Sequence, residues 1–431
     1  MKKLSALVLS LVLCMAVVSS AMAATTVEFW HAGSGATGAT ITAAVEAFNK
    51  TVGAEKGIEV KEVFQGSYDE TLAKTMNAIA AGNQPAIVML ERSTGVATMA
   101  SNGALATLDD YVTASGMDMS DFLEILLYFS YDAEGNLISL PYMRSNAVYY
   151  YNKTMFDELG LTPPATIDEL VEVGKKLHKV NDKGETEVYG FEMYCMSAGQ
   201  WVLQNMLVQL GSNCFSEDGN SCPALEDGTM LTVLKAWKSW VDEGWCSIPS
   251  ITDTGTVLRQ NFAQGKIASM IYSCGSMNGI LDAVAQSEKP FEVGVAYIPT
   301  FGIQTPPVGG NNIALVSNNN SKEVLDAAWE FVNFLMSPEQ AALSSAGTGY
   351  VPATKSAAAT ETIQKLWAEK PTFKVAYDQL LTATIEINRS DYSTDFLEAL
   401  NKAASLLIQD QSITPEEAVQ LLKDEAAIIF P

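Results

Sequence analysis

The sequence has 431 residues, of which 48% are hydrophobic, and a formal net charge of −24. A chain of this length exceeds what one hydrophobic core usually covers, so two domains are expected. The negative charge argues against nucleic acid and anionic membranes as partners, whereas a small anion can still be bound by locally placed arginines and backbone amides.

The first residues have the charged start, apolar run and small-residue end of a secretory signal. Lys2 and Lys3 precede the apolar run 4–18, and the stretch that follows ends in Ala23. The run is shorter than the roughly 20 residues that cross a bilayer, so we expect cleavage after Ala23 and a soluble periplasmic or extracytoplasmic chain. Bulky residues precede Cys14, so a lipid anchor is not expected.

Strands and helices alternate directly after this segment. The predicted elements are a strand at 27–30, a helix whose apolar face carries Ile41, Ala44, Val45 and Phe48, a strand at 58–64, a helix at 68–81 and a strand at 85–90. This β-α-β-α-β order predicts a parallel sheet with helices on both faces. Ligands bind such sheets at the carboxyl ends of the strands.

A second α/β series lies further along the chain. Its predicted elements are strands at 137–141 and 147–151, a helix that begins at the capping box Thr166/Glu169, and strands at 293–298 and 313–316. The stretch 299–310 between the last two strands is rich in proline and glycine, as expected for a crossing between two lobes.

The carboxyl-terminal part is predicted to be helical. An amphipathic helix is expected at 321–336, and Ser337 and Thr414 each precede a proline in the pattern of a helix start. Together, the two series and this helical segment predict an α/β protein of two lobes.

Five cysteines follow the expected cleavage site. Cys214 and Cys222 flank a polar loop and can close a small disulfide in an oxidising compartment, but the odd number leaves at least one thiol unpaired. There is no Cys-x-x-Cys pair, and the only histidines, His31 and His178, are far apart in the sequence. Neither a zinc site nor a cofactor is therefore expected.

Several distinct short motifs are spread along the chain, namely Phe29-Trp30-His31, Gly66-Ser67-Tyr68, Tyr150-Tyr151-Asn152-Lys153 and Gly347-Thr348-Gly349-Tyr350-Val351-Pro352. With these motifs the sequence resembles the family 1 extracellular solute-binding proteins of bacterial ABC importers, over nearly the whole chain after residue 23. The first motif, the stretch 97–101 and Gly275-Ser276 are most similar to the members that bind glycerol-3-phosphate.

The resemblance implies a two-lobed periplasmic-binding-protein fold of type II, in which each lobe is a mainly parallel sheet flanked by helices. One lobe would comprise 24–130 and 299–340, and the other 131–298 and 341–431. The resemblance also implies that the two lobes close over a ligand and that the closed protein docks onto the transmembrane subunits of an ABC permease. Such a protein would be a monomer that catalyses no reaction.

The implied ligand is glycerol-3-phosphate or a glycerophosphodiester, and a neutral sugar or oligosaccharide is the alternative within the family. Two other classes of protein stay open from the residues. A glycoside hydrolase needs only two close carboxylates, and the chain has 50 acidic residues, although no motif selects a pair. A sensor subunit that signals to a membrane receptor would have the same sequence features.

Two turns are candidate ligand contacts. Ser273 and Ser276 lie where an apolar strand meets a helix, and backbone amides at a helix start favour an anion. Gly309 and Gly310 would let a ligand approach the backbone. An ordinary turn explains the first pair equally well and the second pair better. The resemblance, however, implies a ligand-contacting serine in the first turn and favours a ligand contact at the two glycines.

Two arginines are candidate anchors for a phosphate. Arg389 matches the family arginine that pairs with phosphate, and a guanidinium suits this role because it donates two parallel hydrogen bonds. The alternative is a surface salt bridge with Asp391 or Glu386. Arg144, with Ser145 beside it, lies where similar members carry small hydroxyl residues, so it either adds a second anchor or indicates another ligand.

The remaining candidates are aromatic or acidic. Tyr68 and Tyr350 correspond to ligand-contacting tyrosines, and Trp201 to one of two tryptophans of the same pocket; the alternative for each is an ordinary core or surface residue. Glu91 follows a predicted strand, where the family has a glutamate that accepts ligand hydroxyls. Glu91 is shifted by one position from that glutamate, however, and Arg92 occupies the matched position. A shift of one residue along a strand turns the side chain to the opposite face of the sheet.

Overall fold

A computed structural model of the chain describes residues 24–194, 200–248, 254–384 and 387–431. The predicted signal segment 1–23 with Cys14, and also Cys195 and Glu386, lie outside the described residues. In the described part of the chain, no helix is both long and apolar enough to cross a membrane.

The strands are β1 (Thr25–His31), β2 (Ile58–Phe64), β3 (Ile87–Glu91), β4 (Leu140–Asn152), β5 (Lys179–Val180), β6 (Thr186–Val188), β7 (Phe191–Glu192), β8 (Cys246–Ser247), β9 (Ser269–Ser273), β10 (Val293–Ala296) and β11 (Val308–Leu315). The helices before β9 are α2 (Gly35–Lys50), α3 (Val52–Lys56), α4 (Tyr68–Ala81), α5 (Thr94–Ser101), α6 (Asp109–Ser115), α7 (Lys153–Leu159), α8 (Ile167–Leu177), α9 (Gln200–Gln209), α10 (Pro223–Glu226), α11 (Thr229–Asp242) and α12 (Thr254–Ala263). The later helices are α13 (Met277–Ala285), α14 (Lys322–Leu335), α15 (Pro338–Thr348), α16 (Lys355–Ala358), α17 (Glu361–Glu369), α18 (Pro371–Leu380), α19 (Ser393–Ala404) and α20 (Pro415–Ile429), with a short 3-10 turn, η4 (Cys274–Ser276), before α13.

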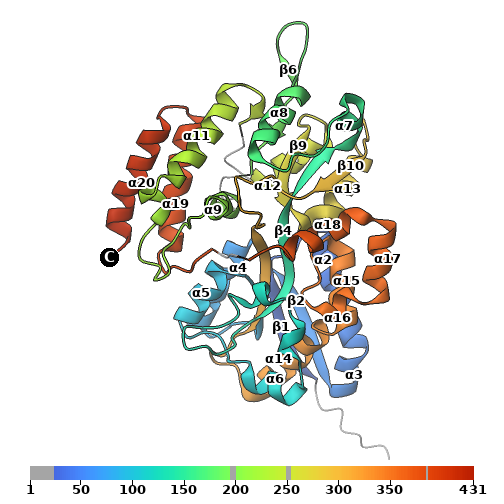
Figure 1. Cartoon of the computed structure of the whole chain (residues 1–431). Helices are drawn as coiled ribbons and strands as arrows, with labels where there is room; N and C mark the ends of the chain where they lie inside the picture. The colour runs from blue at the N-terminus through green and yellow to red at the C-terminus, as the bar shows by residue number, and fades with distance from the viewer. Residues whose placement is uncertain (1–23, 195–199, 249–253, 385–386) are drawn as a thin grey trace, which may run out of the picture.

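One mixed sheet runs through both lobes. Its strands follow the order β2-β1-β3-β11-β4-β9-β7-β8, and β10 also pairs with β4. β1 is parallel to β2 and β3, and β7 is parallel to β8 and β9, whereas β4 and β11 are antiparallel to their neighbours. Parallel strands thus form the outer part of each lobe, and two antiparallel strands join the lobes (Figure 1).

The strand β4 corrects one prediction. The sequence predicts two strands, at 137–141 and 147–151, but the chain forms one strand of 13 residues. Its first half pairs with β11 and its second half with β9 and β10, so it belongs to both lobes. All its residues except Tyr151 are buried. The polar residues in the stretch 142–146 suggested a break between two strands. In the structure this stretch continues the strand, and its residues are buried at the junction between the lobes.

The strand β11 corrects a second prediction. The sequence predicts a crossing at 299–310 and a strand only at 313–316, yet β11 already begins at Val308 and contains Gly309 and Gly310. Gly310 has a φ of +95°, and the pairing with β4 shifts between Gly310 and Asn312. A glycine in the left-handed region allows this irregularity within a strand. The strand β11 therefore includes the last part of the predicted crossing.

The predicted first α/β series is confirmed. β2 and α4 have the predicted bounds, and α2 buries the four predicted residues on its apolar face. On that face, the ring of Phe48 lies edge-on against Phe331 and Phe334 of α14, with centroid distances of 5.1 and 5.5 Å. The apolar residues of this face repeat with the period of the helix, which depends only on local backbone geometry. The sequence therefore predicts the face well.

Capping residues set most of the predicted helix starts. Thr166 and Thr414 form the expected capping boxes with the glutamates three residues later. Ser337 is an exception, because its side chain makes no capping bond to α15. Its hydroxyl instead donates to the backbone carbonyl of Phe334 at 2.8 Å, which leaves Pro338 as the local signal for that helix start.

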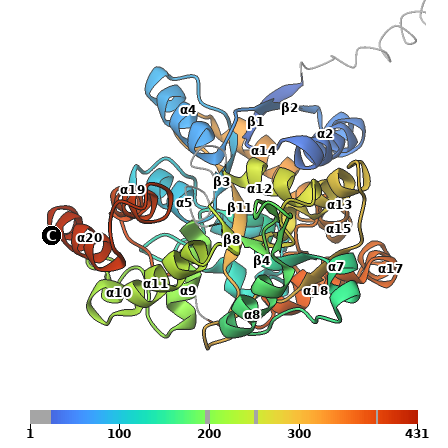
Figure 2. The same cartoon turned by 90° about the horizontal axis from the view of Figure 1, so that it is seen from above.

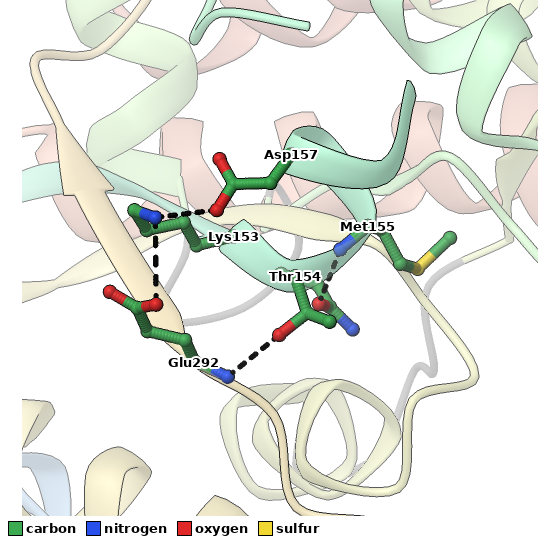
Figure 3. Close-up of polar contacts among 6 residues, drawn as sticks. Lys153, Thr154, Met155, Asp157 and Glu292 are labelled. Atoms are coloured by element: carbon green, nitrogen blue, oxygen red, sulfur yellow. Dashed lines mark hydrogen bonds and ion pairs between the residues drawn. The ribbon is translucent and has the colours of Figure 1, made fainter. Parts of the chain in front are cut away.

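The Tyr-Tyr-Asn-Lys motif joins β4 to β10. The side chain of Asn152 caps α7 by accepting a hydrogen bond from the backbone N–H of Met155 at 3.0 Å. Lys153 lies 2.6 Å from Asp157 and 3.5 Å from Glu292, the residue before β10 (Figure 3). The backbone N–H of Glu292 also donates to the Thr154 hydroxyl at 3.1 Å. This motif therefore has a structural role.

The carboxyl-terminal helices form a flank of the molecule. α19 packs on α20, and both lie beside α11 in two perpendicular views (Figures 1 and 2). The ring of Phe396 lies 5.9 Å from Phe215 and 5.4 Å from Phe430, so aromatic contacts fasten the end of the chain. The residue boundaries predicted for the two lobes stay a prediction.

Candidate ligand-binding site

Two tyrosines from distant parts of the sequence meet between the lobes. Tyr68 begins α4, directly after β2, and its hydroxyl accepts a hydrogen bond from the Asn311 side chain at 3.0 Å. It also accepts one from the hydroxyl of Tyr350. Burial raises the pKa of both tyrosines, and the nearby charge of Arg144 acts the other way on Tyr68. Both phenols therefore stay neutral and can donate or accept hydrogen bonds at neutral pH.

Tyr350 lies against the turn between β9 and α13. A β-carbon added to Gly275 would be only 2.5 Å from the tyrosine ring. One added to Gly349, whose φ is +116°, would be 2.4 Å from the carbonyl oxygen of Cys274. Both glycines are thus needed for this contact, which explains in physical terms why the Gly-Tyr motif and the Gly275 turn occur together.

The two serines of this turn differ in their contacts. Ser273 accepts a hydrogen bond from the backbone N–H of Gly275 at 3.2 Å, and its carbonyl oxygen accepts one from the Tyr150 hydroxyl at 3.0 Å. Ser276 precedes α13 but makes no side-chain capping bond. An ordinary helix cap at Ser276, the alternative to a ligand contact, is therefore not what the structure contains.

Arg144 lies at the centre of the junction. Its side chain is fully buried, and Nη1 donates to Oδ1 of Asn312 at 2.6 Å. The amide nitrogen of Asn312 in turn donates to the hydroxyls of Ser130 and Ser139, at 3.2 and 2.8 Å. The backbone carbonyl of Arg144 accepts from Val351, next to Tyr350. A buried guanidinium is thereby held in one orientation beside the two tyrosines.

Ser145, Gly309 and Trp201 form the adjoining part of the site. Ser145 is buried and opposes Gly309 across the pairing of β4 and β11. A β-carbon on Gly309 would lie 3.0 Å from the Ser145 hydroxyl and 3.2 Å from the Trp201 ring. Glycine therefore lets the half-buried indole of Trp201 approach the strand. The resemblance places the second tryptophan of that pocket near Ser197 or Ala198, and both of these residues lie outside the described part of the chain.

Arg389 contacts the turn that precedes β4. Its Nη1 donates to the carbonyl oxygen of Tyr131 at 2.9 Å, and its Nη2 donates to that of Tyr128. The guanidinium also lies 5.2 Å from the centre of the Phe129 ring, and burial lowers its pKa. In the described part of the chain no ion pair joins Arg389 to Asp391, so the surface salt bridge with that residue is not formed.

Arg92 shares the Phe129 ring with Arg389. Its guanidinium lies 4.8 Å from the ring centre, and its Nε donates to the carbonyl oxygen of Val308 at 3.0 Å. Glu91, by contrast, accepts hydrogen bonds from the backbone N–H and the hydroxyl of Ser93, at 2.9 and 2.8 Å. The carboxylate is turned toward the start of α5, although its charge still raises the pKa of Tyr68.

Three of the four arginines in the chain gather around the start of β11. Arg92 bonds to Val308, Arg144 pairs with Gly310, and Arg389 joins through the shared Phe129 ring. The fourth, Arg259, lies 5.5 Å from the centre of the Tyr272 ring. Several lysines, in contrast, form exposed ion pairs along helices. Guanidinium groups are thus concentrated where the lobes meet.

Sequence reasoning noted Arg92 only as the residue at the position of the family glutamate, and it did not single out Phe129, Asn311 or Asn312. The two asparagines are fully buried and orient Tyr68 and Arg144. Two consecutive polar residues inside an otherwise apolar strand were a signal for this role, because buried amides need specific partners. Within the described residues, no group of three or more His, Cys, Asp and Glu side chains is arranged to hold a metal ion.

A buried histidine lies at the same edge of the sheet, at the end of β1. His31 is 1% exposed, and its Nε2 lies 2.6 Å from Glu62. Its Nδ1 accepts a hydrogen bond from the backbone N–H of Gly33, so the neutral ring carries its proton on Nε2 and donates it to Glu62. Burial lowers the pKa of His31 from 6.5, although Glu62 acts in the opposite direction.

We expect this histidine to make the protein less stable in acid. As the pH falls below 6.5, the unfolded chain binds a proton at His31 that the folded chain does not, so the free energy of unfolding decreases. His31→Gln should flatten the dependence of stability on pH in this range, as measured by urea unfolding at a series of pH values. His178→Gln is the matched control, and equal slopes for the two variants would contradict the prediction.

The fold and the site together define a two-lobed solute-binding protein. A family model described as bacterial extracellular solute-binding protein matches residues 43–373. The chain belongs to this family, whose members are the solute-binding components of ABC importers, and the predicted family and fold class are thereby confirmed.

Relatives and solved structures agree with this assignment. The sn-glycerol-3-phosphate-binding periplasmic protein UgpB of Salmonella typhimurium is 27% identical over 398 residues, which cover 86% of this chain and 84% of the relative. UgpB from Mycobacterium tuberculosis in complex with glycerophosphocholine has a TM-score of 0.79 at 23% identity and covers 94% of this chain and 98% of that one. The GacH receptor of Streptomyces glaucescens, solved unliganded and with acarbose, has the same TM-score at 21% identity, covering 94% and 98%.

Proposed function

We propose that this protein captures glycerol-3-phosphate or a glycerophosphodiester between its lobes and delivers it to the transmembrane subunits of an ABC permease. The observation that carries the proposal is the gathering of Arg92, Arg144 and Arg389 around the start of β11, in a chain whose net charge is −24. Fixed guanidinium groups favour a phosphate, whereas a neutral sugar needs none. The relatives named for glycerol-3-phosphate binding support the same ligand.

The proposed ligand contacts are the candidates from the sequence, Tyr68, Glu91, Arg144, Ser145, Trp201, Ser273, Ser276, Gly309, Gly310, Tyr350 and Arg389. In this proposal the arginines hold the phosphate, the tyrosine hydroxyls and Glu91 bind the glycerol hydroxyls, and Trp201 covers the carbon skeleton. The protein acts as an exported monomer in the periplasm or another extracytoplasmic compartment, after loss of residues 1–23, and it leaves the ligand chemically unchanged.

Calorimetry with the ligand-free protein tests the proposal. The protein is unfolded, dialysed and refolded to remove bound solute, and is then titrated with glycerol-3-phosphate, glycerophosphocholine and maltose. We expect one-to-one binding of at least one phosphate ester and no heat of binding with maltose. Binding of maltose alone would overturn the phosphate assignment and favour the neutral sugar, while the family assignment would stand.

A further inference from the structure

A polar loop between α9 and α10 supports the segment that carries Arg389. Within this loop, which spans residues 213–222, the backbone N–H of Ser216 donates to the carbonyl oxygen of Ser221 at 3.0 Å. The hydroxyl of Ser216 accepts from the backbone N–H groups of Asn220 and Ser221, at 3.2 and 3.1 Å. These bonds fold the loop back on itself and bring its two ends together.

The residues on both sides of Arg389 are hydrogen-bonded to this loop. The backbone N–H of Asn388 donates to the side chain of Asn213 at 3.2 Å, and its amide nitrogen donates to the carbonyl oxygen of Phe215 at 2.9 Å. The hydroxyl of Ser390 donates to the carbonyl oxygen of Gly219 at 2.6 Å. Gly219 has a φ of +73°, and a β-carbon there would lie 2.7 Å from the carbonyl oxygen of Arg389. The loop thus sets the position of the Arg389 backbone.

The loop begins and ends at a pair of buried cysteines. Cys214 is fully buried, Cys222 is 5% exposed, and the structure has both as thiols. The contact with the Cys222 side chain, together with burial, raises the pKa of the Cys214 thiol. The backbone fold of the loop and the burial of both sulfurs place the pair where a bond between them would close the loop at its base.

We infer that Cys214 and Cys222 form a disulfide in the exported protein, and that this bond fixes the loop that positions Arg389. The second half of this inference rests on the proposed function. The two thiols lose two protons and two electrons and form one sulfur–sulfur bond, while the disulfide of a thiol oxidant is reduced to two thiols. Because both sulfurs are buried in the folded chain, the bond forms during folding, before the loop packs against α19.

Peptide mapping tests the bond itself. The full chain is exported from a bacterial host, denatured without reductant, alkylated, and cut by a protease that cleaves after glutamate. Cleavage after Glu217 separates the two cysteines, so their peptides stay joined only through sulfur. We expect the joined peptides from the wild type and from Cys195→Ser, and separate peptides from Cys214→Ser. Alkylated Cys214 and Cys222 in the wild type would overturn the inference.

Binding measurements test the positioning role. Cys222→Ser should weaken glycerol-3-phosphate binding by about threefold to tenfold, because a less ordered loop holds Arg389 less well. The same change added to Arg389→Gln should cause no further loss, which a general loss of stability would not produce. Cys246→Ser, at another buried thiol, should keep the wild-type affinity. Equal losses from Cys222→Ser with and without Arg389 would refute the positioning role.

Two further comparisons keep these tests decisive. If Cys222→Ser does not fold, the oxidised and reduced forms of the wild type replace it, and the reduced form should bind glycerol-3-phosphate more weakly. If the wild type binds no phosphate ester, the proposed function fails, but the peptide map still decides whether the disulfide forms.

Discussion

Replacing Arg144 with glutamine should weaken binding of glycerol-3-phosphate by about 100-fold, or roughly 3 kcal/mol. The guanidinium is fully buried and is held by Asn312 at 2.6 Å, so its charge is fixed before the ligand arrives. Glutamine keeps a donor for Asn312 and much of the volume but removes the charge. The loss should therefore be specific to anionic ligands, and calorimetry of the variant with the phosphate ester measures it.

Arg144→Lys is the matched control for charge. Lysine keeps the positive charge but not the planar set of donors, so we expect a loss of about tenfold, smaller than that of glutamine. Thermal melting of both variants checks that they fold, because a change at a buried site also affects stability. A folded Arg144→Gln variant with wild-type affinity for the phosphate ester would remove Arg144 from the proposed site.

Local signals explain the parts of the fold that the sequence predicts well. The apolar face of α2 repeats with the helical period, and the capping boxes at Thr166 and Thr414 need only residues three positions apart. β4 and β11 were predicted less well because burial on both faces removes the alternation that marks a strand. That burial arises from pairing between segments far apart in the sequence, which periodicity does not reveal.

The same difference between local and long-range signals explains which residues of the candidate site could be predicted. Tyr68 and Tyr350 follow from motifs that resemble a family, and the structure brings them into contact. Asn311 was missed, and Arg92 was noted without a role, because their importance comes from their partners, Tyr68 and Val308, which are distant in sequence. Arg389 follows from the family match, but its contacts with Tyr128 and Tyr131 depend on a turn that no local pattern marks.

Gly310→Ala should lower the free energy of unfolding by about 3 kcal/mol or more. The residue has a φ of +95°, which costs an alanine roughly 1–3 kcal/mol. The added β-carbon would also lie 2.2 Å from the carbonyl oxygen of Met143, so β4 and β11 would have to move apart, at a cost of a further 1–3 kcal/mol or so. Because these strands join the lobes, both the melting temperature and ligand affinity should fall.

Gly309→Ala is the control that separates stability from binding. No positive φ restricts Gly309, and its β-carbon would meet Ser145 and Trp201 at 3.0 and 3.2 Å, a tight contact that a side-chain movement can relieve. We expect its stability to stay within about 1 kcal/mol of the wild type, while displacement of Trp201 weakens ligand binding. If the two variants had equal melting temperatures, β4 and β11 would be able to move apart at little cost, and the positive φ of Gly310 would not determine their pairing.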